Sequence, residues 1–171
     1  MREEEAHEKQ VVERVGCWVI TVSDTRTPET DESGRTTCEE LEAHGHRLLL
    51  YRIVKDEPSQ IGELLEEARA DGHVQAVILT GGTGISSRDN TYEVIREFID
   101  KELPGFGELF RWLSFREVGP RAILSRAVAG VMGQKLIFSL PGSSGAVRLA
   151  LRELILPLLG HAVYELDTDC A

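Results

Sequence analysis

A short apolar run followed by a glycine-rich turn constrains the fold of this chain more than any other stretch. Residues 76–79 (AVIL) lead into Thr80-Gly81-Gly82-Thr83-Gly84, and a helix-like segment begins at Thr91. Glycine lets the backbone adopt a positive φ and approach a ligand closely, and the amides of such a turn can face a phosphate. The stretch matches neither the Rossmann nor the P-loop nucleotide motif. It predicts an anion-binding loop after a buried strand, with a purely structural turn as the alternative.

The rest of the chain alternates apolar, β-branched runs with segments of helical periodicity. The runs predict strands over 15–22, 47–54, 74–79, 128–132 and 136–140, and the periodic segments predict helices over 36–44, 58–71, 91–101, 106–115 and 146–159. The last two strands form a hairpin through Gly133-Gln134, and Pro157 is expected to kink or end the last helix. The alternation predicts an α/β fold: a mostly parallel sheet covered on both faces by helices, plus a late antiparallel pair.

Length and charge narrow the class of protein. The 171 residues suit a single domain over 15–171, preceded by a charged, flexible segment over 1–14. The net charge of −10 argues against nucleic acid and against an anionic membrane surface as partners. Three dispersed cysteines, Cys17, Cys38 and Cys170, fit a reduced protein with inert thiols. With neither a signal peptide nor an apolar run of about 20 residues, the expected location is the cytoplasm.

Two carboxylates are the sharpest candidates for chemistry. Asp56 and Asp89 each sit in a loop that follows a predicted strand, and such loops meet at one edge of a parallel sheet. Two carboxylates beside an anion-binding loop could hold Mg²⁺, which prefers oxygen ligands. The alternative is that both acids only cap the helices that follow them.

Other residues are candidate ligand contacts. Arg88 could add a forked cationic contact, while Ser23, Ser125 and Arg126 are either ligand contacts or ordinary turn groups. A second glycine-rich turn, Pro141-Gly142-Ser143, follows the last predicted strand.

Several motifs, in a shared order from residue 15 to 159, resemble the MoaB/MogA family. They are Val22-Ser23-Asp24-Thr25, Asp31-Glu32-Ser33-Gly34, Val54-Lys55-Asp56-Glu57, Leu79 to Gly84, Pro104 to Phe110, Leu113-Ser114-Phe115, Leu124 to Gly130 and Leu140-Pro141-Gly142-Ser143. The segments at 113–115, 125–130 and 141–143 are similar to the MoaB branch.

The resemblance implies a three-layer, MogA-like molybdopterin-binding fold and a role in molybdenum cofactor biosynthesis. The active relatives adenylylate molybdopterin with Mg-ATP and release pyrophosphate, and members commonly form trimers or larger assemblies. By position, Asp56 and Asp89 match the two acids tied to catalysis and to the metal. The loop at 81–84 with Ser23 is similar to the part that surrounds the phosphates, and Ser125 and Pro141-Gly142 border the pterin pocket.

Two other functions remain open from the sequence. One is a trimeric protein that binds molybdopterin or its precursor without transferring AMP. The other is a scaffold that uses the same fold for protein contacts. The apolar segment at 106–115 favours an oligomer, because one subunit would leave part of it exposed.

Overall fold

The computed structural model describes residues 10–168, which form one six-stranded mixed sheet with helices on both faces. The strand order is β2-β1-β3-β6-β5-β4. The four strands β2, β1, β3 and β6 pair in parallel, whereas β5 pairs antiparallel with both β6 and β4. The strands are β1 (Gly16–Val22), β2 (Arg47–Val54), β3 (Ala76–Thr80), β4 (Lys101–Glu102), β5 (Val128–Met132) and β6 (Lys135–Leu140).

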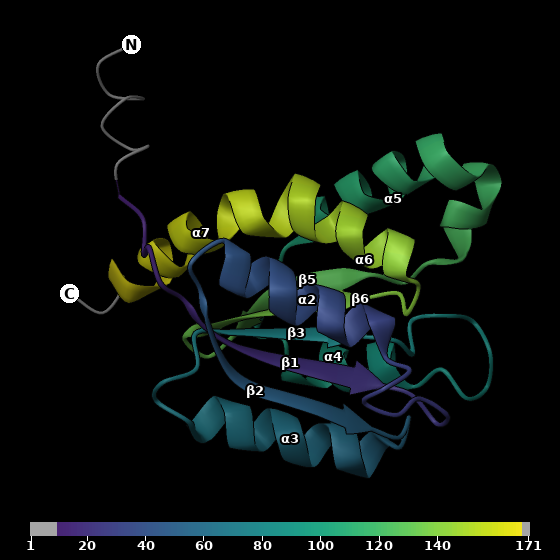
Figure 1. Ribbon diagram of the computed structural model, residues 1–171, viewed down its shortest axis with the longest axis horizontal. Coiled ribbons are helices and arrows are strands. Elements are labelled where there is room, and N and C mark those ends of the chain that lie inside the picture. Colours follow the sequence, from purple (N-terminus) through teal and green to yellow (C-terminus); the bar gives the residue numbers. More distant parts are fainter. Residues whose placement is uncertain (1–9, 169–171) are drawn as a thin grey trace.

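Helices cover both faces of the sheet, and Figure 1 shows some of them above and below the strands and others in front of and behind them. On one face pack α2 (Glu32–Ala43), α5 (Pro104–Val118), α6 (Ser144–Ala150) and α7 (Leu156–Thr168). On the other face pack α3 (Pro58–Ala70) and α4 (Thr91–Phe98). Side chains alternate along β1, so that Cys17 and Val19 enter the first core while Trp18 and Ile20 enter the second. The predicted α/β fold with a late antiparallel hairpin is confirmed.

Several elements differ from the prediction, among them α5, which is longer than the predicted 106–115. Helix α2 begins at Glu32 rather than at residue 36, because the side chain of Asp31 accepts a hydrogen bond from the backbone of Gly34 and caps the first turn. Helix α4 ends at Phe98, and the polar residues Lys101 and Glu102 form an edge strand. A 3₁₀ segment, η1 (Gly119–Leu124), follows α5.

Pro157 does not end the last helix. A wider π turn, η2 (Leu151–Ile155), precedes it, and the backbone N–H of Leu156 bonds to the carbonyl of Leu151 five residues back. This widening accommodates the proline ring, which would clash with a regular turn, and the helix continues as α7 to Thr168.

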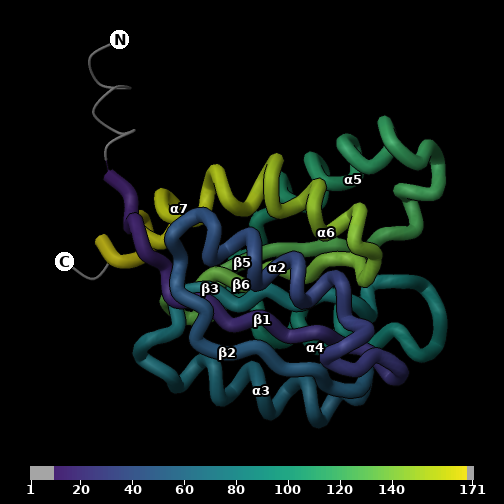
Figure 2. Tube along the Cα trace, in the orientation of Figure 1, coloured from purple at the N-terminus to yellow at the C-terminus, as the bar shows by residue number. Residues whose placement is uncertain are grey.

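The described chain starts beside α7, as Figure 2 shows. The backbone N–H of Val12 donates to the carbonyl of Gly160 at 3.0 Å, so this part of the segment predicted to be flexible is tied to the domain. Residues 1–9 of that segment lie outside the described residues, as does Cys170. Cys17 and Cys38 are free and buried, and burial raises the pKa of each thiol to about 12. In the described part of the chain, no helix has both the length and the apolar character that crossing a membrane requires.

Candidate functional site

The glycine loop begins where β1, β3 and β6 end together. Gly81 has φ of +101°, and a Cβ there would lie 2.2 Å from the carbonyl oxygen of Val22, so no other residue fits without displacing β1. The N–H of Gly81 donates to the carbonyl of Leu140 at 2.9 Å. This bond joins the glycine loop to the second glycine-rich turn, which follows Leu140 directly.

The two turns line one cleft of about 650 Å³ at the carboxyl ends of the parallel strands. In open α/β sheets this edge is where ligands bind. The structure brings a large part of the sequence-predicted set to this cleft: Gly81, Gly82, Thr83, Gly84, Asp89, Ser125, Pro141, Gly142 and Ser143. The opposite wall comes from α5 and η1 and carries both charged and apolar side chains, among them Phe110, Ser114, Glu117 and Arg121.

Asp56 lies beneath the glycine loop and is only 6% exposed. Both of its carboxylate oxygens accept from the backbone N–H of Asn90, at 3.2 and 3.3 Å. Burial raises the pKa of this carboxyl above its ordinary value, and the charges of Asp89 and Asp24 add to the rise. A cation beside Asp56 would relieve this unfavourable charge.

Asp89 lies at the other end of the loop and lines the cleft. Its Oδ2 atom accepts from the N–H of Ser86 at 2.8 Å and lies 2.7 Å from where a Cβ on Gly84 would be. Glycine at position 84 therefore allows this carboxylate to sit against the loop.

Asp89 lines the cleft whereas Asp56 lies outside its lining, but the charge of Asp89 acts on the pKa of Asp56, so the two carboxylates lie near one another. Among residues 10–168 there is no group of three or more His, Cys, Asp or Glu side chains that could hold a metal ion alone. Mg²⁺ in phosphate-handling sites usually takes one or two carboxylates and completes its shell with water and substrate oxygens. Asp56 and Asp89 offer that number of protein ligands.

Arg88 does not reach the cleft. Its guanidinium donates to Asp24 at 2.7 and 3.1 Å and to Glu57 at 3.3 Å, and these contacts lie on the loops that follow β1 and β2. The expected forked contact with a ligand is therefore replaced by ion pairs with two carboxylates. The hydrogen bond and charge of Arg88 hold the pKa of Asp24 below its usual range.

Ser23 and Thr80 also lie outside the lining of the cleft. The Ser23 hydroxyl accepts from the backbone N–H groups of Thr25 and Arg26, at 3.3 and 3.1 Å, and so closes a turn after β1. Thr80 is fully buried, and its hydroxyl lies 3.3 Å from that of Thr21 in the neighbouring strand. Both residues support the loops that carry the cleft.

Sequence reasoning missed a polar cluster that holds the second turn. Arg26 and the hydroxyl of Ser33 both donate to the carbonyl of Gly142, each at 2.7 Å. Arg26 also pairs with buried Asp31 at 3.3 Å, and the Tyr51 hydroxyl donates to the same carboxylate at 2.7 Å. The signal was present in Asp31-Glu32-Ser33-Gly34, whose acid and serine are typical of a helix start.

Hydrogen bonds decide the ionisation of Asp31. Burial acts to raise the pKa of this carboxyl, but donation from Thr21, Tyr51 and the Gly34 amide, together with the charge of Arg26, outweighs burial and lowers it below its usual value. Asp31 is therefore a buried carboxylate that stays ionised and pairs with Arg26, the residue that donates to the carbonyl of Gly142.

Comparison with known proteins gives a consistent result over nearly the whole chain. A family model described as "Probable molybdopterin binding domain" matches residues 18–161. Molybdenum cofactor biosynthesis protein B from Halalkalibacterium halodurans is 53% identical over 166 residues, covering 96% of this chain and 98% of that protein.

Solved structures agree with the fold. A crystal structure of a molybdenum cofactor biosynthesis protein B superimposes with a TM-score of 0.89 at 48% identity, covering 93% of this chain and 99% of that one. The tungsten cofactor synthesizing protein MoaB from Pyrococcus furiosus gives a TM-score of 0.76 at 41% identity, covering 85% and 92%.

Proposed function

Since the chain belongs to the MoaB/MogA family of molybdenum cofactor biosynthesis proteins, we propose that it adenylylates molybdopterin with Mg-ATP and releases pyrophosphate. Its place in molybdenum cofactor biosynthesis follows from the family, whose domain binds a small molecule. The specific reaction, with ATP and molybdopterin as substrates, is our proposal.

The observation that carries the proposal is the cleft between the two glycine-rich turns. Its volume of about 650 Å³ falls within the range of small-molecule sites, roughly 300–1,000 Å³. One side is formed by the glycine loop and Asp89, and the other by the mixed apolar and charged surface of α5 and η1. Such a cleft suits a ligand with an anionic end and a flat polar ring.

The attacking group in this reaction is itself an anion. An oxygen of the terminal phosphate of the pterin forms a bond to the α-phosphorus of ATP, and the bond from that phosphorus to the bridging oxygen breaks as pyrophosphate leaves. A phosphate needs no strong base to become a nucleophile, so Asp56 and Asp89 are assigned to holding the cation rather than to removing a proton. Held by these carboxylates, Mg²⁺ would supply positive charge to offset that of the phosphate oxygens.

Positioning is then the main contribution of the protein. The glycine loop orients phosphate oxygens through its amides, and the rigid support beneath it, Gly81 bonded to Leu140, keeps that geometry fixed. Correct alignment of two reactants supplies a large part of the rate enhancement in transfers of this kind.

The alternative is a non-catalytic binding protein, in which the cleft retains molybdopterin or its precursor without transferring AMP. A scaffold that uses the fold only for protein contacts is a third possibility, in which loss of both acids would leave a partner complex intact.

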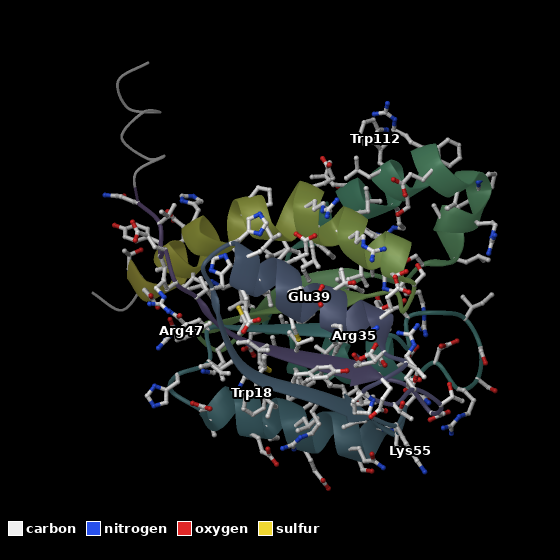
Figure 3. All side chains as sticks on the ribbon, viewed as in Figure 1. Trp18, Arg35, Glu39, Arg47, Lys55 and Trp112 are labelled. Carbon is white, nitrogen blue, oxygen red and sulfur yellow. The ribbon has the colours of Figure 1, made fainter. Side chains whose placement is uncertain are left out.

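We further propose that the protein assembles as a homotrimer or a larger oligomer. An apolar patch on α5 and η1 remains exposed by half or more, and consists of Leu109, Trp112, Phe115, Val118, Ile123 and Leu124. Figure 3 shows Trp112 projecting away from the sheet. Contiguous apolar surface of this kind marks an interaction site.

The decisive experiment is single-turnover AMP transfer with purified protein, molybdopterin, Mg²⁺ and α-labelled ATP. Asp56→Asn and Asp89→Asn keep the size and the hydrogen-bond acceptor of each side chain but remove its charge. Glu66→Gln, an exposed carboxylate on α3, is the matched control.

Labelled adenylylated pterin with wild type and Glu66→Gln, lost in both aspartate variants, would support the enzyme and identify its acids. Tight pterin binding without labelled product in the wild type would assign the protein to the binding class. Full turnover by either aspartate variant would remove that residue from the mechanism.

A further inference from the structure

Arg126 belongs to the predicted ligand contacts, yet its guanidinium is occupied by the loop that ends at Asp89. Its Nε donates to the carbonyl of Gly84 at 2.8 Å and its Nη2 to the carbonyl of Asp89 at 2.9 Å. Its Nη1 pairs with the carboxylate of Glu93, and its Cζ lies 4.9 Å from the centre of the Tyr92 ring. Arg126 is absent from the residues that line the main cleft.

The contact with Asp89 acts on the next residue through one peptide plane. The chain has no cis peptide among its described residues, so the carbonyl of Asp89 and the N–H of Asn90 point in opposite directions. Arg126 binds the carbonyl side of this peptide, and Asp56 accepts from its N–H side. A cation, one peptide dipole and a buried carboxylate are thus arranged in a row.

This arrangement matters because Asp56 has few donors. Within the part of the chain that the structure describes, the N–H of Asn90 is the one group that donates a hydrogen bond to its carboxylate. A cation bound to the carbonyl end of a peptide polarises it and strengthens the bond at its N–H end. Arg126 therefore supports Asp56 without touching it.

We propose that Arg126 is a positioning residue, which grips the Gly84 and Asp89 carbonyls and thereby aims the Asn90 N–H at the Asp56 carboxylate. The inference rests on the proposed function for its catalytic consequence, since Asp56 is assigned there to the reaction. The structural part of the inference is that Arg126 orients the peptide between Asp89 and Asn90, and this part does not depend on which ligand the cleft binds.

The test uses four variants. Arg126→Gln removes the charge and the fork, whereas Arg126→Lys keeps the charge but can reach only one carbonyl. Arg69→Gln is the matched control, because Arg69 also donates to a backbone carbonyl, that of Phe98 at 3.3 Å, and its Cζ lies 5.0 Å from the centre of the Phe98 ring, but outside this loop. Melting curves establish that each variant is folded.

The first readout is amide hydrogen exchange at Asn90, followed by NMR in the protein without substrates. Loss of the clamp is expected to speed exchange roughly three- to tenfold in Arg126→Gln, the effect of about one hydrogen bond. Arg126→Lys should give a smaller increase, and Arg69→Gln should stay within about twofold of wild type. Glu93→Gln, which keeps the guanidinium but removes its ion pair, should shift the same amide in the same direction.

The second readout is turnover. A positioning role predicts that kcat falls roughly tenfold to a hundredfold in Arg126→Gln while KM for ATP changes little, because the side chain does not line the cleft. A direct phosphate contact would instead raise KM strongly, and that result would overturn the inference.

Unchanged exchange at Asn90 in both Arg126→Gln and Glu93→Gln would also overturn it, whatever the turnover. If wild type transfers no AMP but the exchange pattern holds, the proposed function fails while the clamp stands. The two proposals can therefore be rejected separately.

Discussion

Gly82 is the position where a single added methyl group should disturb the site most. Its φ is +67°, a conformation that costs an L-residue about 1–2 kcal/mol. A Cβ there would lie 1.9 Å from Oγ1 of Thr91 and 2.6 Å from Oδ2 of Asp56, and both neighbours are buried. Overpacking of such a site adds roughly 1–3 kcal/mol. Gly82→Ala should therefore lose about 2–5 kcal/mol of unfolding free energy, as the two costs combine.

Gly45 supplies a matched control for the backbone part of this cost. Its φ is +84°, but no atom lies within 4 Å of the position that a Cβ would take. Gly45→Ala should therefore lose only about 1–2 kcal/mol, the cost of the left-handed conformation alone. The difference between the two variants isolates the crowding beneath the glycine loop.

Urea unfolding followed by tryptophan fluorescence can measure both variants, because Trp18 is buried in β1. All samples need the same protein concentration, since assembly would make the midpoint depend on it. Gly82→Ala should also lose AMP transfer, while Gly45→Ala keeps it. Equal losses of stability in the two variants would show that Thr91 and Asp56 move aside freely, and would refute the steric reasoning.

Three further predictions test other parts of the molecule. Because the pKa of Asp31 lies below its usual value in the folded protein, its ionised form stabilises the fold above about pH 4, and this contribution is lost as pH falls through the lowered pKa. Asp31→Asn should thus be less stable than wild type at pH 7, by about 1–3 kcal/mol, with the gap closing in acid, as urea titrations at several pH values would reveal. In a Cys170→Ser background, Cys17 and Cys38 should resist a thiol reagent at pH 8 until urea unfolds the chain; rapid labelling of the folded protein would contradict their burial. Trp112→Glu should reduce the mass measured by light scattering to that of a monomer, and a wild type that is already monomeric would dismiss the assembly.

The fold was largely readable from the sequence because its signals are local. The run at 76–79 is apolar and β-branched, and β3 forms there. The edge strand at Lys101–Glu102 gave no such signal, since two polar residues pair with β5 only because the hairpin places a partner beside them. The π turn before Pro157 was not predicted either, because a proline in a helical pattern usually kinks or ends the helix.

The sequence predicted those residues of the candidate site that lie in glycine-rich turns after strands. It did not predict the contacts between side chains and groups on different loops. Gly81, Gly142 and Asp89 line one cleft as their positions after strands suggested. Arg88 instead pairs with Asp24, 64 positions earlier in the chain, and no spacing in the sequence reveals such a partner. The same holds for Arg126, whose carbonyl acceptors carry no side-chain signature at all.

The hydrogen bond from Gly81 to Leu140 ties one side of the cleft to the central sheet. Substitutions on that side should cost more stability than substitutions on the facing wall. The two glycine-rich turns follow β3 and β6, which are adjacent central strands, so a substitution in either turn also disturbs the pairing of these strands. The facing wall, with Ser114, Glu117 and Arg121, rests on α5 and on the short η1 segment at the periphery. Substitutions on the wall should therefore change the shape of the cleft while the hydrogen bond between the two glycine-rich turns is kept.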